Sequence, residues 1–282
     1  MLKVISTHIF LKQQLRGAHL DALAGAGAEG IEIFCARQHF DYTERGDVTA
    51  IAEWFRANPA RPWALHAPLH FDVDNGRGGA PAVNVVHAEK SRRIDSMDEV
   101  KRALESAEQI PFANMILHLG ERHDSWNQRT LEHALTAVEH LHAFARPLGV
   151  KVLLENLEND VAQPENLVET VEIGHLDDVA FCLDVGHAHI GGGIGRAIHA
   201  MGPRIISSHI HDNAGDRDNH LWPGDGTIDW PETMHGLAAL DEPPATVLEI
   251  SSRMEESGSM LEHKLRHSFE LLETSAQPSR QS

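Results

Sequence analysis

The stretch VAFCLDVGHAHI, residues 179–190, begins as an apolar run and then carries Asp184, His187 and His189 within six residues. A strand that is buried on both faces of a parallel sheet has a continuous apolar sequence of this kind. Acids are rarely buried unless they are paired or bind a metal. The polar groups after this run therefore predict a functional site at the carboxyl end of a buried strand.

The same pattern recurs along the chain, where strand-like apolar runs alternate with amphipathic helix-like segments. The expected strands are 4–10, 30–35, 63–69, 114–120, 150–157, 179–187, 205–213 and 246–251, and the expected helices are 19–28, 47–58, 97–110, 128–149, 164–174, 195–202, 230–240 and 260–273. Strands joined by helical crossovers form a parallel sheet. Eight such units favour an α/β fold with a single (β/α)8 TIM barrel, which typically needs about 250 residues. A doubly wound open sheet is the alternative.

Domain organisation follows from the absence of any linker or composition break in the 282 residues. We expect one barrel over residues 1–274 and a disordered, polar C-terminal tail over 275–282. The segment GAGAEG, residues 25–30, matches G-x-G-x-x-G but follows a helix and precedes a strand. A dinucleotide-binding loop requires the opposite order, so we interpret these glycines as a helix stop and a tight turn.

The composition disfavours several classes of partner. The net charge is −18 and the lysines and arginines are scattered, which argues against nucleic acid and anionic membranes. No apolar run is long enough for a transmembrane helix, and the first residues lack the features of a signal peptide. Cys35 and Cys182 lie in apolar runs, as expected for buried free thiols in a reducing compartment. We expect a cytoplasmic protein, and association into a homo-oligomer is left open.

Polar side chains end six consecutive expected strands, the third to the eighth. Catalytic groups of TIM barrels lie at the carboxyl ends of the strands, so these side chains should converge. Several carboxylates in one pocket repel one another unless a cation compensates them. Mixed imidazole and carboxylate ligands suit Zn²⁺, Mn²⁺ or Fe²⁺. The sequence thus predicts a divalent metal site among His66, His118, Glu155, Asp184, His187, His209, His211 and Glu249, with Asp218 and His220 in the loop after the seventh strand.

These residues lie in segments that resemble the xylose isomerase-like TIM barrels. The segments are HAPL (66–69), LHLG (117–120), LLENLEN (153–159), FCLDVGHAH (181–189), HIHDNAGDRDNHLWPGDGTIDW (209–230) and VLEI (247–250). The resemblance covers nearly the whole chain. The family includes sugar phosphate isomerases/epimerases and endonuclease IV-type apurinic endonucleases. The pattern therefore indicates the fold but does not identify the substrate.

The resemblance to the epimerase-type members implies one metal ion, held by Glu155, Asp184, His209 and Glu249. In this interpretation Glu155 and Glu249 are also the general base and acid. His187, Arg217, His66 and His211 are the expected substrate-binding residues. The resemblance leaves open whether the histidine ligand is His209 or His211, which are two residues apart on the expected strand. His209 is preferred because the Asp-Asn that follows matches the family better in that alignment.

The resemblance to the endonuclease-type members implies up to three zinc ions on nine ligands. All nine have counterparts here, namely His66, His118, Glu155, Asp184, His187, His209, Asp218, His220 and Glu249. The two hypotheses are therefore a metal-dependent isomerase or epimerase of a sugar or sugar phosphate, and a trinuclear-zinc phosphodiesterase acting on abasic DNA.

Electrostatics favour the sugar enzyme. The chain is acidic, and HFDVDNGRGG (70–79) is acidic and glycine-rich where a DNA-contacting loop would be expected. A small carbohydrate is therefore the expected partner, and nucleic acid is disfavoured. A non-enzymatic barrel that binds a structural metal is disfavoured. In structural sites a few protein ligands fill all coordination positions, whereas the ligand set here is large.

Overall fold

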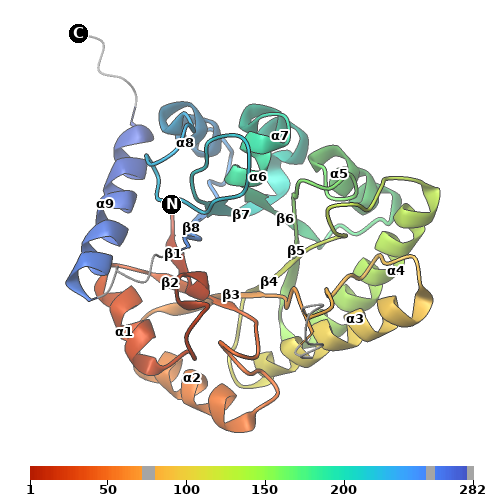
Figure 1. Cartoon of the computed structure of the whole chain (residues 1–282), viewed down its shortest axis with the longest axis horizontal. Helices are drawn as coiled ribbons and strands as arrows, with labels where there is room; N and C mark the ends of the chain where they lie inside the picture. The colour runs from red at the N-terminus through yellow and green to blue at the C-terminus, as the bar shows by residue number, and fades with distance from the viewer. Residues whose placement is uncertain (72–79, 252–257, 278–282) are drawn as a thin grey trace.

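The structure, a computed structural model, describes residues 1–71, 80–251 and 258–277. In it, parallel strands pair in sequence order and the last pairs with the first, which closes a barrel (Figure 1). The strands are β1 (Lys3–Ser6), β2 (Gly30–Phe34), β3 (Arg61–His66), β4 (Asn114–Leu117), β5 (Lys151–Glu155), β6 (Ala180–Asp184), β7 (Ile205–Ile210) and β8 (Ala245–Leu248). The expected closed (β/α)8 barrel is confirmed, and the open doubly wound sheet is wrong.

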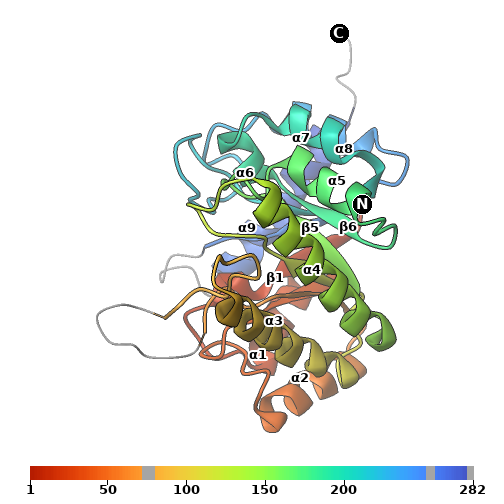
Figure 2. The same cartoon turned by 90° about the vertical axis from the view of Figure 1, so that its right-hand side faces the viewer.

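The helices lie outside the strands and surround the barrel, as Figures 1 and 2 show. The α-helices are α1 (Gly17–Gly25), α2 (Arg45–Ala57), α3 (Lys90–Leu104), α4 (Gln128–Ala145), α5 (Pro164–Ile173), α6 (Val185–Ile190), α7 (Ile194–Met201), α8 (Trp230–Ala238) and α9 (Ser259–Ser275). Short 3-10 helices are η1 (Thr7–Phe10), η3 (Glu105–Glu108), η4 (Arg146–Leu148) and η5 (Gly202–Arg204). No helix of the described ranges is both long and apolar enough to cross a bilayer.

All eight strands end earlier than expected, and side-chain hydrogen bonds explain this in two of them. The strand expected over residues 4–10 stops at Ser6, whose hydroxyl accepts a hydrogen bond from His8 N and starts η1. Thr7 Oγ1 in turn accepts from Phe34 N, so a side chain replaces a strand partner of β2. The strand expected over 179–187 stops at Asp184, which caps α6 by accepting from His187 N at 2.6 Å. The chain after β6 thus forms two helices where one was expected.

The strand register shifts at two places, and the side chain at each shift packs inside the barrel. The β2–β3 register passes over Trp63, and the β6–β7 register passes over Ile206. Both side chains pack against an interior cluster of Ala64, Ile116, Leu153, Ala180 and Cys182. Trp63 also contacts the cluster of Val4, Ala245 and Val247. Ala64, Leu153 and Ala180 precede His66, Glu155 and Asp184 on their strands, so apolar side chains lie beneath the polar strand ends.

Two smaller expectations from the sequence are confirmed, and two others fall largely outside the described residues. Helix α1 ends at Gly25, and Gly27 adopts a φ of 98°, so GAGAEG is a helix stop and turn as predicted. Cys35 and Cys182 are buried free thiols. Helix α9 continues to Ser275, and residues 278–282 of the expected tail lie outside the described residues, as do residues 72–79 of the acidic glycine-rich segment.

The interior cluster predicts the effect of Leu153→Ala. Leu153 is fully buried, so truncation leaves a cavity and should lower the free energy of unfolding by about 2–5 kcal/mol. Urea unfolding followed by circular dichroism measures this loss. Ile173→Ala is the control, because Ile173 is 49% exposed and should change stability by no more than about 0.5 kcal/mol. Equal midpoints for the two variants would contradict the assignment of the interior cluster.

Candidate metal centre

Four ligand-type side chains from consecutive strands meet at the carboxyl-terminal mouth of the barrel. Glu155 ends β5, Asp184 ends β6, His209 lies on β7 and Glu249 follows β8. All four are buried, and one ligand atom from each lies within 4.8 Å of the others. Ligand atoms at about 2.0–2.2 Å from one Zn²⁺ ion lie within about 4 Å of each other, so a small inward movement would suit a single ion.

The imidazole of His209 lies at the centre of this group. Its Nδ1 is 3.3 Å from Glu155 Oε1, 3.4 Å from Glu249 Oε2 and 3.8 Å from Asp184 Oδ2. Glu155 Oε1 and His209 Nδ1 are both buried without a hydrogen-bond partner, although they are neighbours. Buried polar atoms are normally satisfied. Two neighbouring ligand atoms that lack hydrogen-bond partners could both bind one cation placed between them. The residues present therefore suit a divalent metal.

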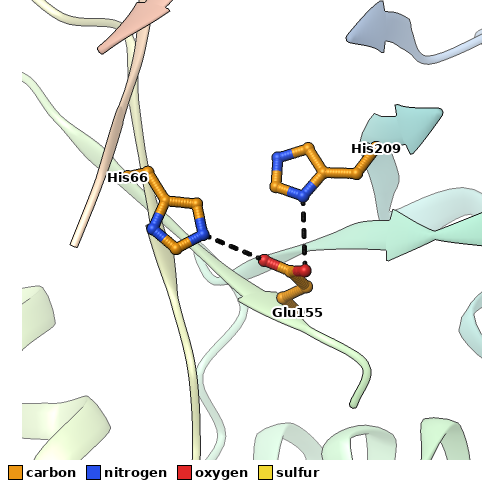
Figure 3. Close-up of side chains that lie close together, drawn as sticks. All are labelled: His66, Glu155 and His209. Carbon is orange, nitrogen blue, oxygen red and sulfur yellow. Dashed lines mark ion pairs between the residues drawn. The ribbon is translucent and has the colours of Figure 1, made fainter. Parts of the chain in front are cut away.

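Two further histidines approach Glu155 Oε2, the carboxylate oxygen that does not face His209. His118 Nε2 is 3.0 Å and His66 Nε2 is 3.5 Å from Glu155 Oε2. Figure 3 shows the Glu155 carboxylate between the His66 and His209 rings, with one oxygen toward each. His66, Glu155 and His209 form a second set of ligand atoms close enough for one ion.

A third set lies toward the loop between β7 and α8. Asp218 Oδ2 is 2.9 Å from His220 Nε2 and 3.4 Å from His187 Nε2. His211 belongs to this set with Asp218 and His220, and its Nε2 is 3.0 Å from Asp184 Oδ2. Gly186 makes room for His211, because a Cβ at this position would lie 2.0 Å from the imidazole.

Backbone carbonyls orient three of these imidazoles. His66 Nδ1 donates to Ala67 O at 2.9 Å, His187 Nδ1 to Asn156 O at 3.0 Å, and His220 Nδ1 to Glu249 O at 2.8 Å. Donation from Nδ1 leaves the lone pair of a neutral imidazole on Nε2. In each of these histidines Nε2 faces a carboxylate of the site, which is the arrangement expected of a metal ligand.

Polar side chains fix the segments that carry the ligands. Asn156 donates to Asp184 O at 2.9 Å and accepts from Asp184 N at 2.8 Å, which ties the ends of β5 and β6 together. Asp212 is fully buried and holds the loop after β7. Its carboxylate accepts from Gly224 N, Ile228 N and Trp230 Nε1 at 2.9, 3.2 and 3.0 Å.

The histidines compensate the carboxylates electrostatically. Burial alone would raise the pKa of Glu249, but the His209 and His220 imidazoles outweigh it and bring the pKa to about 2. The pKa of Glu155 is likewise held well below its usual range, because His209 and His118 overcome the effect of burial. Burial would lower the pKa of His209, yet the carboxylates of Glu249, Glu32 and Glu155 raise it well above its usual value. Protons on imidazoles thus supply the positive charge that a bound cation would replace.

A cavity of about 390 Å³ opens beside these groups. His66, His118, Glu155, His187, Asp218, His220 and Glu249 line it. The structure does not bring Arg217 to this cavity; its side chain is 74% exposed and pairs with Asp216. His211 is fully buried against Asp184 and does not line the cavity.

The sequence analysis missed three residues near the site. His8 lines the cavity from η1, and burial lowers its pKa to about 4, which keeps it neutral. Arg122 lies on the cavity rim after β4. Glu32 is buried in the middle of β2, and its Oε2 is 3.2 Å from His209 Nε2. An acid within the otherwise apolar run GIEIF was the available signal for Glu32.

Comparison with known proteins identifies the family. The profile of the xylose isomerase-like TIM barrels matches residues 20–274. The chain belongs to this family. A curated relative, the inosose isomerase of Bacillus velezensis, is 25% identical over 217 residues, which cover 72% of this chain and 71% of that protein.

Solved structures of other proteins have the same fold. A D-tagatose 3-epimerase-like protein has a TM-score of 0.78 at 21% identity and covers 98% of this chain and 97% of its own. The IOLI protein, solved with a bound zinc atom, has a TM-score of 0.76 at 18% identity and covers 98% of both chains. At these identities the two structures support the fold alone.

The role of Asp212 predicts the effect of Asp212→Asn. An amide keeps one acceptor and places an NH₂ group against two donors, so stability should fall by roughly 2–4 kcal/mol. Chemical unfolding measures the loss, and limited proteolysis should cut the loop between β7 and α8 faster. Asp216→Asn is the control, since the Asp216 side chain is 60% exposed. Unchanged stability of Asp212→Asn would show that the carboxylate does not anchor the loop.

Proposed function

We propose that the chain is a metal-dependent isomerase or epimerase of a sugar or sugar phosphate. One observation carries the proposal: the carboxylates of Glu155 and Glu249 approach His209 Nδ1 from strands on different sides of the barrel, beside an open cavity. Two carboxylates that face one small molecule can remove and return protons on different faces. The similarity to an inosose isomerase and the fold shared with a D-tagatose 3-epimerase-like protein support a carbohydrate substrate.

The proposed metal ligands are Glu155, Asp184, His209 and Glu249. A divalent ion bound there would act as a Lewis acid toward adjacent oxygens of the sugar. Zn²⁺, Mn²⁺ and Fe²⁺ all suit this mixed donor set. Zinc is the first metal to test, because the IOLI protein was solved with it.

The residues of the chain would carry the proton transfers. Glu155 acts as the general base that removes a proton from the carbon next to the carbonyl. Glu249 first takes up a proton from a neighbouring imidazolium such as His220, whose Nδ1 is 3.7 Å from Glu249 Oε2, and then acts as the acid that delivers it. Their low pKa values keep both carboxylates ionised before substrate binds. His66 and His187 line the cavity and would orient the substrate oxygens. The geometry gives no such support to His211 and Arg217.

This proposal predicts the effect of Glu155→Gln and of Glu249→Gln. Each amide cannot accept or deliver the proton, so turnover should fall by at least about 10²–10⁴-fold while the fold is kept. Deuterium incorporation from D₂O into a panel of ketohexoses and inososes, read by NMR with the Zn²⁺- or Mn²⁺-loaded protein, measures the proton transfer. Glu139→Gln on the exposed side of α4 is the control. Full activity in either site variant would refute the acid–base assignment.

A second candidate function is supported by the two flanking sets of ligands. His66 and His118 approach Glu155, and His187 and His220 approach Asp218, so three adjacent groups could hold ions. Such a cluster fits a phosphodiesterase acting on abasic DNA. The charge of −18 disfavours it, and Arg122 is the only lysine or arginine among the described residues that line the cavity.

Metal content distinguishes the two candidates. Elemental analysis of protein purified with added Zn²⁺ and then dialysed should give one tightly held ion per chain for the isomerase. Three ions per chain, together with cleavage of an abasic duplex at physiological salt, would reverse the ranking. A matched duplex without the abasic site serves as the control substrate.

A further inference from the structure

Glu32 has an unusual environment for a carboxylate. It lies in the middle of β2, is fully buried and projects into the barrel interior beneath the mouth. Its Oε2 is 3.2 Å from His209 Nε2, and its Oε1 has no hydrogen-bond partner. Within residues 1–71, 80–251 and 258–277, no lysine or arginine forms an ion pair with it. A buried carboxylate with a single imidazole partner is costly and calls for a role beyond packing.

The partner of Glu32 is the histidine at the centre of the proposed metal site. A neutral imidazole carries its proton on one nitrogen and its lone pair on the other. If Nε2 donates to Glu32, the lone pair lies on Nδ1, which faces Glu155, Asp184 and Glu249. Figure 3 shows the other ring nitrogen of His209 on the side away from Glu155.

His209 differs in this respect from His66, His187 and His220. Those three donate to backbone carbonyls, which no substitution of a side chain removes. The orientation of His209 depends on a side chain instead, and on a charged one. A carboxylate that accepts from a metal-binding imidazole also raises the basicity of the ligand nitrogen.

We propose that Glu32 is a positioning residue of the metal centre, which fixes His209 with Nδ1 as its metal-binding nitrogen and thereby increases metal affinity. The inference rests on the metal site proposed above. A purely structural role for Glu32 would change folding stability alone, so metal affinity separates the two explanations.

The test compares Glu32→Ala, Glu32→Gln and the control Ser207→Ala. Ser207 is also fully buried, lies two residues before His209 on β7 and accepts a hydrogen bond from Trp63 and not from a residue of the metal site. Competition with a chromophoric chelator measures the affinity of each folded protein for Zn²⁺. We expect Glu32→Ala to bind Zn²⁺ about 10–100-fold more weakly than the unmodified chain. Glu32→Gln should lose less, because its amide oxygen can still accept from Nε2, and Ser207→Ala should lie within about twofold of the unmodified chain.

The outcomes separate this inference from the proposed function. If the unmodified chain binds no Zn²⁺, both are wrong. If it binds Zn²⁺ and the Glu32 variants bind it equally well, the role of Glu32 alone is wrong. Should Glu32→Ala fail to fold, ¹⁵N NMR of histidine in the unmodified Zn²⁺-loaded chain decides. A proton on Nε2 of His209 is expected, and a proton on Nδ1 would overturn the proposal.

Discussion

Carboxylates that converge inside a protein need positive charge close to them, and this constraint explains most of the polar architecture at the barrel mouth. Glu155, Asp184 and Glu249 surround one imidazole and are almost fully buried. The histidines around them have raised or lowered pKa values according to the balance between burial and these acids. A cation and imidazolium protons are alternative ways of meeting the same electrostatic requirement.

The rest of the barrel holds these groups in place. Trp63 and Ile206, which the strand register passes over, fill the interior with apolar atoms at the other end. The ligands therefore lie on a rigid apolar layer. Buried hydrogen bonds of Asn156 connect the ends of β5 and β6, and those of Asp212 hold the loop that carries Asp218. Sites built on strands in this way are held more firmly than sites on loops.

The fold was predictable because its signal repeats. Alternating apolar and amphipathic segments along the whole chain indicate a βα-repeat, and parity along β5 and β8 places Glu155 and Glu249 with interior Leu153 and Val247. Most of the candidate site followed from one rule, that strand ends of such barrels meet. The short extent of β1 was not predictable, because it depends on Ser6 and Thr7 making side-chain hydrogen bonds that compete with the strand.

Other features need coordinates for different physical reasons. Glu32 lies within a strand and not at its end, so the strand-end rule passes over it. His209 lies on β7 and His211 directly follows this strand, and only their distances to Glu155 and Asp218 separate the two sets of ligand atoms. Arg217 lies in the same loop as Asp218 and His220, but its side chain is exposed. The sequence does not show in which direction a loop side chain points.

Anomalous diffraction from crystals grown with Zn²⁺, recorded on both sides of the zinc absorption edge, tests the central claim most directly. The account predicts a peak enclosed by Glu155, Asp184, His209 and Glu249, with His209 Nδ1 facing it. No peak at the barrel mouth, or zinc bound only to surface histidines such as His263 and His267, would contradict it.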